Sequence, residues 1–364
     1  MKKHIVLILA LALGFASCEK KATTFNVSVN LANADENTMV YLRKMVDNKP
    51  VTVDSAMFTD EMAVLTDSVG DPQMLYMLKV KDMRGSMQFF PENQDVTVTG
   101  DMQNPQEVVI MGAEAQSLFN EYNEAHNAIL AQIKDLYAQM EVAYNANDTV
   151  AIEQLDAKGD SIRQVSQDYR NDFIKTNAGS FVAHYILNSR KQDLPLEELK
   201  EKRAVFTTES IYSKDLDDYI SKQEALEIGQ PFIDFTLQTA EGESVNLAER
   251  IAANKVTMVD FWASWCGPCR HENPFVKAAY EKYHELGFDV LAVSVDQDEA
   301  AWLKAVEADA LPYTQVRDTD NSVSESYLIY YIPSNFLIDQ EGNFIAKGLR
   351  GEELEAKLAE IFAL

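Results

Sequence analysis

The sequence predicts a multidomain α+β protein with an N-terminal antiparallel β-sandwich, a helical spacer and a C-terminal α/β domain. Three patterns support this prediction: short runs of alternating apolar and polar residues, then long runs of helical periodicity, then strand and helix patterns in alternation. A chain of 364 residues is long enough for two or three domains. We expect a leader at 1–17 followed by domains at 18–112, 113–227 and 228–364.

The overall charge restricts the classes of partner. The chain has 58 acidic and 32 basic side chains, a formal net charge of -26. Binding to nucleic acid requires Lys and Arg to displace counterions from phosphates, so we expect no nucleic-acid partner. The same excess disfavours docking on anionic lipid headgroups.

The first residues have the features of an export signal. Two lysines precede an apolar run at 5–15, which small residues and Cys18 follow. That run is shorter than the roughly 20 apolar residues of a membrane-spanning helix. Residues 15–18 resemble a bacterial lipobox, with Phe15 where Leu is usual, and the resemblance implies that Cys18 is acylated. We therefore expect a lipid-anchored protein on the periplasmic face of the cell envelope, on either the inner or the outer membrane. Ordinary secretion with an incidental Cys18 is the alternative.

The region 22–112 consists of short apolar runs separated by Asp, Asn, Gly and Pro. Alternation within these runs is typical of strands with one buried face. Several short strands at this spacing predict an antiparallel sandwich. The expected strands lie around 25–31, 40–42, 51–53, 74–78, 88–90 and 96–98.

The period becomes helical from about residue 113 to 225. Two apolar stripes at three- and four-residue steps flank a polar break at 147–149, which predicts an antiparallel helical hairpin. A coiled-coil dimer is the alternative use of these stripes. The stripes are formed by Leu118, Tyr122, Ile129, Ile133, Leu136 and Met140, and by Ile152, Leu155, Ile162, Val165, Tyr169 and Phe173. Shorter helices are expected at 181–188, 196–205 and 216–226.

Strands and helices alternate in the last domain, from about residue 228. Strands are expected at 256–261, 290–295, 336–339 and 344–346, and helices after Cys266, at 300–307 and at 352–362. Glu341-Gly342 predicts a hairpin between the last two strands. This order is typical of a small α/β domain.

The most informative motif is Cys266-Gly267-Pro268-Cys269, where an apolar strand leads into the start of a helix. Free backbone N–H groups and the helix dipole favour a thiolate at Cys266, and the thiolate is the nucleophile in disulfide exchange. Pro268 is tolerated because the first turn does not need its N–H. These are the only cysteines besides Cys18, so the pair serves chemistry or metal binding and not a disulfide framework.

Metal and haem readings of the motif have little support. A structural zinc site would need His271 and His284 in place of a second cysteine pair. Attached c-type haem requires His where Arg270 stands. We expect no metal.

The stretch 259–269 resembles the active site of thioredoxin. Together with Arg270, Glu272 and Pro274, residues 262–266 resemble the TlpA/ResA branch of envelope thioredoxins, and the resemblance covers residues 228–364. It implies a thioredoxin-like domain that acts as a thiol:disulfide oxidoreductase, with Cys266 as the attacking thiolate and Cys269 as the resolving thiol. No cofactor beyond the redox-active disulfide Cys266–Cys269 is expected. The residues that would support the active site are Trp262, Gly267, Pro268, Glu272 and Pro274.

Two further elements match this family. Asp260 corresponds to the buried acid of thioredoxins, where apolar surroundings raise the pKa of a carboxyl group and let it accept the proton of Cys269. The alternative is a strand-end residue that reaches solvent. The segment 331–339 resembles the family's cis-proline segment, with Ser334 where Thr is usual. A cis bond before Pro333 would let Ile332 pair with an extended substrate, and we assign Trp265 to substrate contact as well.

Together these features predict a cell-envelope oxidoreductase that reduces disulfides of exported proteins. Gly267-Pro268 resembles the thioredoxin dipeptide, which implies a reducing potential. Electrons would come from a membrane thiol reductase, because the sequence has no nicotinamide or flavin motif. The alternatives are an isomerase or oxidant, an apocytochrome c maturation factor, and a ligand-binding lipoprotein with secondary redox activity. The N-terminal layout resembles the β-rich domain of unknown function that precedes thioredoxin domains in envelope lipoproteins.

Overall fold

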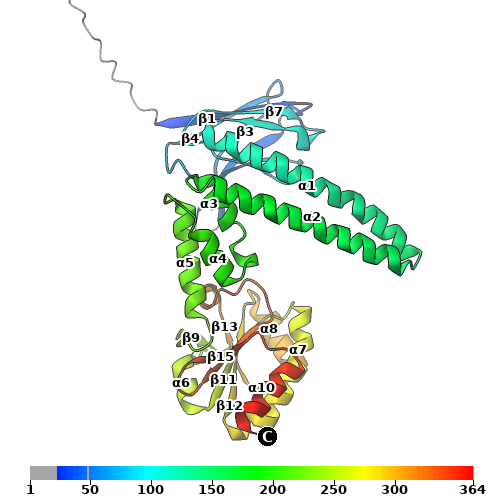
Figure 1. Ribbon diagram of the computed structural model, residues 1–364. Coiled ribbons are helices and arrows are strands. Elements are labelled where there is room, and N and C mark those ends of the chain that lie inside the picture. Colours follow the sequence, from blue (N-terminus) through cyan, green and yellow to red (C-terminus); the bar gives the residue numbers. More distant parts are fainter. Residues whose placement is uncertain (1–22, 47–48, 364) are drawn as a thin grey trace, which may run out of the picture. The chain divides into compact units, whose positions relative to one another are not determined.

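The computed structural model describes residues 23–46 and 49–363. The predicted leader and Cys18 lie outside the described residues. The chain forms two compact units (Figure 1), one comprising residues up to 186 with 206–211, the other comprising 187–205 with 212 onward. None of the helices within the described ranges combines the length and the apolar character that a bilayer crossing requires.

The first unit contains the β-sandwich that the sequence predicts. Its sheets have the strand orders β4-β1-β7-β8 and β3-β2-β5-β6. The alternating residues Phe25, Val27, Val29 and Leu31 of β1 are all buried, so the period-two pattern marks the inner face. The strands are β1 (Thr24–Ala32), β2 (Met39–Val46), β3 (Lys49–Met57), β4 (Met62–Ser68), β5 (Tyr76–Val80), β6 (Met87–Phe89), β7 (Val96–Asp101) and β8 (Val109–Met111), with a 3₁₀ turn η1 (Pro105–Glu107).

Two details of the sandwich differ from the prediction. The pair β1/β7 is parallel, whereas the other pairs of this unit are antiparallel. Between β1 and β7 the chain contributes strands to the second sheet, and β7 then runs beside β1 in the same direction. Sequence periodicity does not reveal the direction in which two strands pair. Strands β4 and β8 were not expected; β8 has only three residues, too few for alternation to be recognised.

The helical hairpin is confirmed. Helices α1 (Glu114–Asn145) and α2 (Thr149–Thr176) are joined at Asn147, which has a φ of 52°, and the Asp148 side chain accepts a hydrogen bond from the Ala151 N–H at 3.0 Å. The Tyr122 ring lies 4.9 Å from the Phe173 ring, so the start of α1 packs against the end of α2.

One position of the second stripe is wrong. Val165 is 50% exposed, and its neighbour Ser166 is buried beside His126. The rings of Phe90, Phe119, Phe181 and Tyr185 pack edge-to-face and join α1 and α3 (Phe181–Asn188) to the sandwich.

The second unit is built on a seven-stranded sheet of order β10-β9-β13-β12-β11-β14-β15, with α4 and α5 preceding it. Its strands are β9 (Thr236–Gln238), β10 (Ser244–Asn246), β11 (Val256–Trp262), β12 (Phe288–Ser294), β13 (Thr314–Arg317), β14 (Ser334–Asp339) and β15 (Phe344–Lys347). Its helices are α4 (Leu196–Arg203), α5 (Ile211–Ala225), α6 (Leu247–Ala253), α7 (Gly267–Tyr283), α8 (Glu299–Asp309), α9 (Ser322–Ser326) and α10 (Glu352–Phe362), with 3₁₀ turns η2 (Lys191–Asp193) and η3 (His284–Leu286).

The two central strands, β11 and β12, are parallel and buried at every position. One face of the sheet forms a core with α7, α8 and α10, and the other forms a core with α6 and α9. Met258 and Trp262 belong to the first core, so the period of two places Asp260 on the face that α7 covers. The fold class is therefore confirmed, while the segment 113–227 is divided between the two units.

Candidate active site

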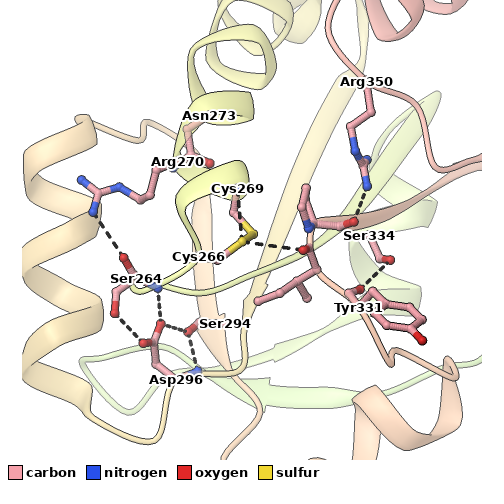
Figure 2. The surroundings of a disulfide bond; sticks show 12 residues. Ser264, Cys266, Cys269, Arg270, Asn273, Ser294, Asp296, Tyr331, Ser334 and Arg350 are labelled. Carbon is pink, nitrogen blue, oxygen red and sulfur yellow. Dashed lines mark hydrogen bonds between the residues drawn. A yellow bond between two sulfur atoms is a disulfide. The ribbon is translucent and has the colours of Figure 1, made fainter. Parts of the chain in front are cut away.

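The two cysteines lie at the N-terminus of α7, where β11 delivers them (Figure 2). They form a disulfide, and the Cys269 N–H donates to the Cys266 sulfur at 3.1 Å. Cys266 is the N-cap residue, so its sulfur lies at the positive end of the helix. Cys266 is 5% exposed and Cys269 1%, which makes Cys266 the more accessible of the two.

The predicted proline segment lies against the disulfide. The bond between Ile332 and Pro333 is cis, and the carbonyl oxygen of Ile332 lies 3.7 Å from the Cys266 sulfur. The Ser334 hydroxyl donates to the Tyr331 carbonyl at 2.9 Å and closes the turn that leads into β14. A backbone segment that lies beside a reactive sulfur can pair with an extended polypeptide.

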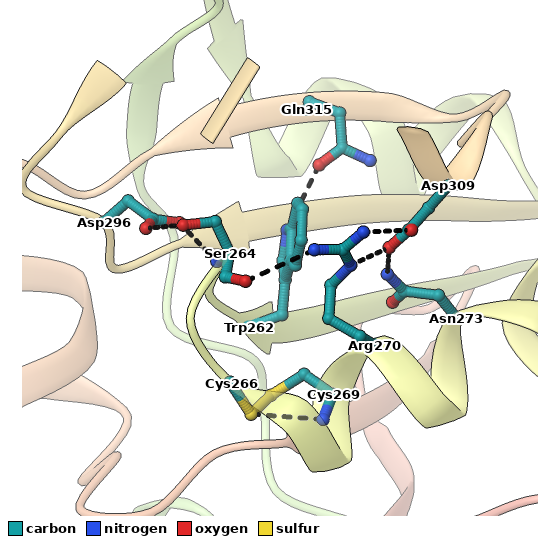
Figure 3. Close-up of polar contacts among 9 residues, drawn as sticks. All are labelled: Trp262, Ser264, Cys266, Cys269, Arg270, Asn273, Asp296, Asp309 and Gln315. Carbon is teal, nitrogen blue, oxygen red and sulfur yellow. Dashed lines mark hydrogen bonds and ion pairs between the residues drawn. A yellow bond between two sulfur atoms is a disulfide. The ribbon is translucent and has the colours of Figure 1, made fainter. Parts of the chain in front are cut away.

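The two tryptophans of the motif have different surroundings. Trp262 is buried, and its indole N–H donates to the Gln315 side-chain oxygen at 3.2 Å (Figure 3). Trp265 is 69% exposed, and Tyr331 on the proline segment is 70% exposed. Gly267 and Pro268 are also exposed. Trp262 therefore belongs to the core, whereas Trp265 is available to a partner.

Asp260 is only 5% exposed. Burial raises the pKa of its carboxyl group to about 7; the positive charge of Arg350 opposes this rise, and the negative charge of Glu272 adds to it. None of the hydrogen bonds among the described residues reaches this carboxyl group through its side-chain oxygens. Asp260 is thus a buried acid that changes protonation near neutral pH.

The other predicted support residues lie on α7. Glu272 accepts a hydrogen bond from the Gly351 N–H at 2.9 Å, and this contact ties α7 to the start of α10. Pro274 lies inside the helix and is exposed. No described contact links Pro274 to the sulfurs, so its role stays a prediction.

Two carboxylates that the sequence reasoning missed hold the loop and helix around the disulfide (Figure 3). Asp296 is buried and accepts hydrogen bonds from the Ser264 N–H at 2.8 Å, the Ser264 hydroxyl at 2.6 Å and the Ser294 hydroxyl at 2.8 Å. Asp296 follows the end of β12, at the edge of the sheet where β11 also ends. Functional residues gather where parallel strands end, and this pattern could have identified Asp296 from the sequence.

The second carboxylate, Asp309, contacts α7. It pairs with the Arg270 guanidinium and accepts from the Asn273 amide at 2.7 Å. Burial opposes ionisation of Asp309, but these hydrogen bonds outweigh it and hold the pKa of the carboxyl group below its usual value. Nothing local in the sequence marks Asp309, because its partners lie 36 and 39 residues earlier.

Two family models and several known proteins match parts of this chain. Residues 228–347 match the AhpC/TSA family, and residues 25–119 match a domain of unknown function, DUF4369. The thiol-disulfide oxidoreductase ResA of Bacillus cereus (strain ATCC 10987 / NRS 248) is 30% identical over 142 residues, which are 39% of this chain and 80% of the relative. ResA of Bacillus subtilis (strain 168) is 26% identical over 142 residues, 39% of this chain and 78% of the relative. A solved thioredoxin domain of a thiol-disulfide oxidoreductase from Bacteroides vulgatus is 34% identical and covers 37% of this chain and 98% of that domain, with a TM-score of 0.36.

The predicted thioredoxin-like resemblance and the β-rich domain of unknown function are both confirmed by these matches. Residues 228–347 are an AhpC/TSA thioredoxin-like domain, and the chain belongs to the thiol-disulfide oxidoreductases homologous to ResA.

Proposed function

We propose that this oxidoreductase reduces disulfide bonds of exported proteins at the periplasmic face of the cell envelope. The observation that carries the proposal is the position of the Cys266 sulfur, at a helix N-terminus and 3.7 Å from the Ile332 carbonyl. Exposed aromatic rings of Trp265 and Tyr331 belong to the same two segments. A thiolate beside this backbone segment and exposed aromatic rings suits an extended polypeptide that contains a disulfide.

The reduction proceeds in two exchange steps. The Cys266 thiolate attacks one sulfur of the client disulfide, forms a mixed disulfide and releases the other client sulfur as a thiolate. Cys269 then loses its proton and attacks the Cys266 sulfur, so that the Cys266–Cys269 disulfide forms and the second client thiolate leaves. Two electrons pass from the cysteine pair to the client. Asp260, with a pKa of about 7, is the group that we assign as acceptor of the Cys269 proton.

The proposed location rests on the sequence around Cys18, which resembles a lipidation site after an export signal. In this compartment the oxidised pair must be reduced again, and we propose a membrane thiol reductase as the donor. The disulfide is the only redox group that this cycle needs. A measured reduction potential distinguishes this role from an oxidant or isomerase, because a reductase pair has the more negative potential.

Trapping of clients tests the proposal. In cells that express the full chain with Cys269→Ser, the mixed disulfide at Cys266 cannot be resolved, so exported proteins should be recovered in covalent complexes that dithiothreitol releases. The matched control is Cys266→Ser, which retains one cysteine of the pair but lacks the attacking thiolate. Equal recovery with both variants, or none with Cys269→Ser, would exclude exported proteins as clients.

A further inference from the structure

The loop 348–351, between β15 and α10, is held tightly against the start of β14. The Gly348 N–H donates to the Asn335 carbonyl at 2.8 Å. The Asn335 side chain donates to the Leu349 carbonyl at 2.8 Å and accepts from the Leu349 N–H at 3.0 Å. Asn335 is buried and follows Pro333 by two positions. The loop therefore keeps a fixed position beside the disulfide.

Arg350 extends this contact to the proline itself (Figure 2). One guanidinium nitrogen donates to the Leu349 carbonyl at 2.8 Å, and the other donates to the Pro333 carbonyl. The next residue, Gly351, donates its N–H to Glu272 on α7. Two adjacent residues of one loop thus connect the proline segment with the helix that carries both cysteines.

The choice of partners is unusual for a guanidinium in a chain with so many acidic residues. None of the ion pairs found within the described residues includes Arg350. Its N–H groups donate to two backbone carbonyls. The planar guanidinium has fixed donor directions and can bind both carbonyls at once, whereas a lysine ammonium would hold them less rigidly. The geometry is that of a clamp on the backbone next to Ile332.

We propose that Arg350 is a positioning residue for the first exchange step: its guanidinium holds the Pro333 carbonyl so that the backbone at Ile332 can receive an extended client. This role rests on the proposed function, because it requires a polypeptide client.

Two variants of the full chain test this role. Arg350→Gln removes both the charge and the planar guanidinium donors, whereas Arg350→Lys keeps the charge and loses the planar pair of donors. Lys347→Gln, on β15, is the matched control, because it removes one positive charge that pairs with Glu227 and does not contact Pro333. Each variant is assayed with a disulfide-containing peptide and with 5,5′-dithiobis(2-nitrobenzoate), a small disulfide without a peptide backbone.

Both Arg350 variants should raise KM for the peptide about tenfold, the loss expected for one charge-assisted hydrogen bond, and change the rate with the small disulfide less than about twofold. Tryptophan fluorescence on urea titration checks that each variant is folded.

Equal losses with the peptide and the small disulfide would overturn the clamp. The peptide assay uses purified protein, so an empty Cys269→Ser trap would refute exported clients without altering the result for Arg350.

Discussion

Replacement of Asp260 by Asn should make the second unit more stable at pH 8 while it slows the enzyme. The Asp260 carboxyl group is buried among the residues that pack against α7, and its pKa rises from 3.8 to about 7. Such a rise makes the ionised form about 4 kcal/mol less favourable in the folded protein than in the unfolded chain. Asn has nearly the same shape and carries no charge, so it removes this penalty.

The sign of the pH dependence follows from proton binding. Between about pH 4 and pH 7 the folded protein keeps the Asp260 proton and the unfolded chain loses it, so the free energy of unfolding falls as the pH rises. Above pH 7 the full penalty is present. Burial of an Asn amide without partners costs about 1 kcal/mol, so Asp260→Asn should raise the free energy of unfolding by about 3 kcal/mol at pH 8. At pH 4 no gain is expected.

Urea unfolding of the oxidised full chain, followed by tryptophan fluorescence, measures this effect. All three tryptophans, at positions 262, 265 and 302, belong to the second unit, so the signal reports on that unit. Asp309→Asn is the matched control: the pKa of Asp309 is lowered, so its loss should destabilise the protein at pH 8, and this effect should fade towards low pH. If Asp260→Asn gave the same difference from wild type at pH 4 and pH 8, the buried-acid explanation would be wrong.

The same Asp260→Asn variant tests the proposed proton transfer. Loss of a general base typically slows a step about 10²-fold, so resolution of a mixed disulfide should slow by that order while the first attack by Cys266 is nearly unchanged. Stopped-flow measurement of both steps with a fluorescent peptide disulfide separates them. An unchanged rate of resolution would assign the Cys269 proton to another acceptor.

Three further expectations concern other parts of the molecule. In the reduced protein at pH 7, iodoacetamide should modify Cys266 at least about tenfold faster than Cys269, because Cys266 is the N-cap residue of α7 and is the more exposed of the two, 5% against 1%; equal rates by mass spectrometry would contradict this. Asp296→Ala leaves the Ser264 donors unpaired and should lower the free energy of unfolding by about 2–3 kcal/mol in urea titrations, whereas a change below about 0.5 kcal/mol would show that water replaces the carboxylate. Cys18→Ser should abolish incorporation of labelled palmitate and release the protein from the membrane fraction; retained label would place the acylation elsewhere.

Local patterns were sufficient for most of the architecture. The alternation of β1, the two stripes of the hairpin and the continuous apolar run of β11 each reflect contacts repeated along one element. The site motif is similarly local, since Cys266 and Cys269 are separated by one helical turn and follow their strand directly. The placement of Asp260 on the face under α7 also follows from strand periodicity.

The sequence by itself determined the order of the elements, the cysteine pair and its chemistry, because these depend on residues within about one turn or one strand of each other. Only the tertiary structure decided the parallel pairing of β1 with β7, the three-residue strands β9 and β10, and the partners of the active-site segments. Asp296 reaches Ser264 across 32 residues and Arg350 reaches Pro333 across 17, and no periodic pattern records which distant groups meet. Such contacts form when strands that are distant in the sequence pair side by side and bring their loops to one edge of the sheet. They therefore contribute to stability only in the folded chain, and a local pattern does not predict them.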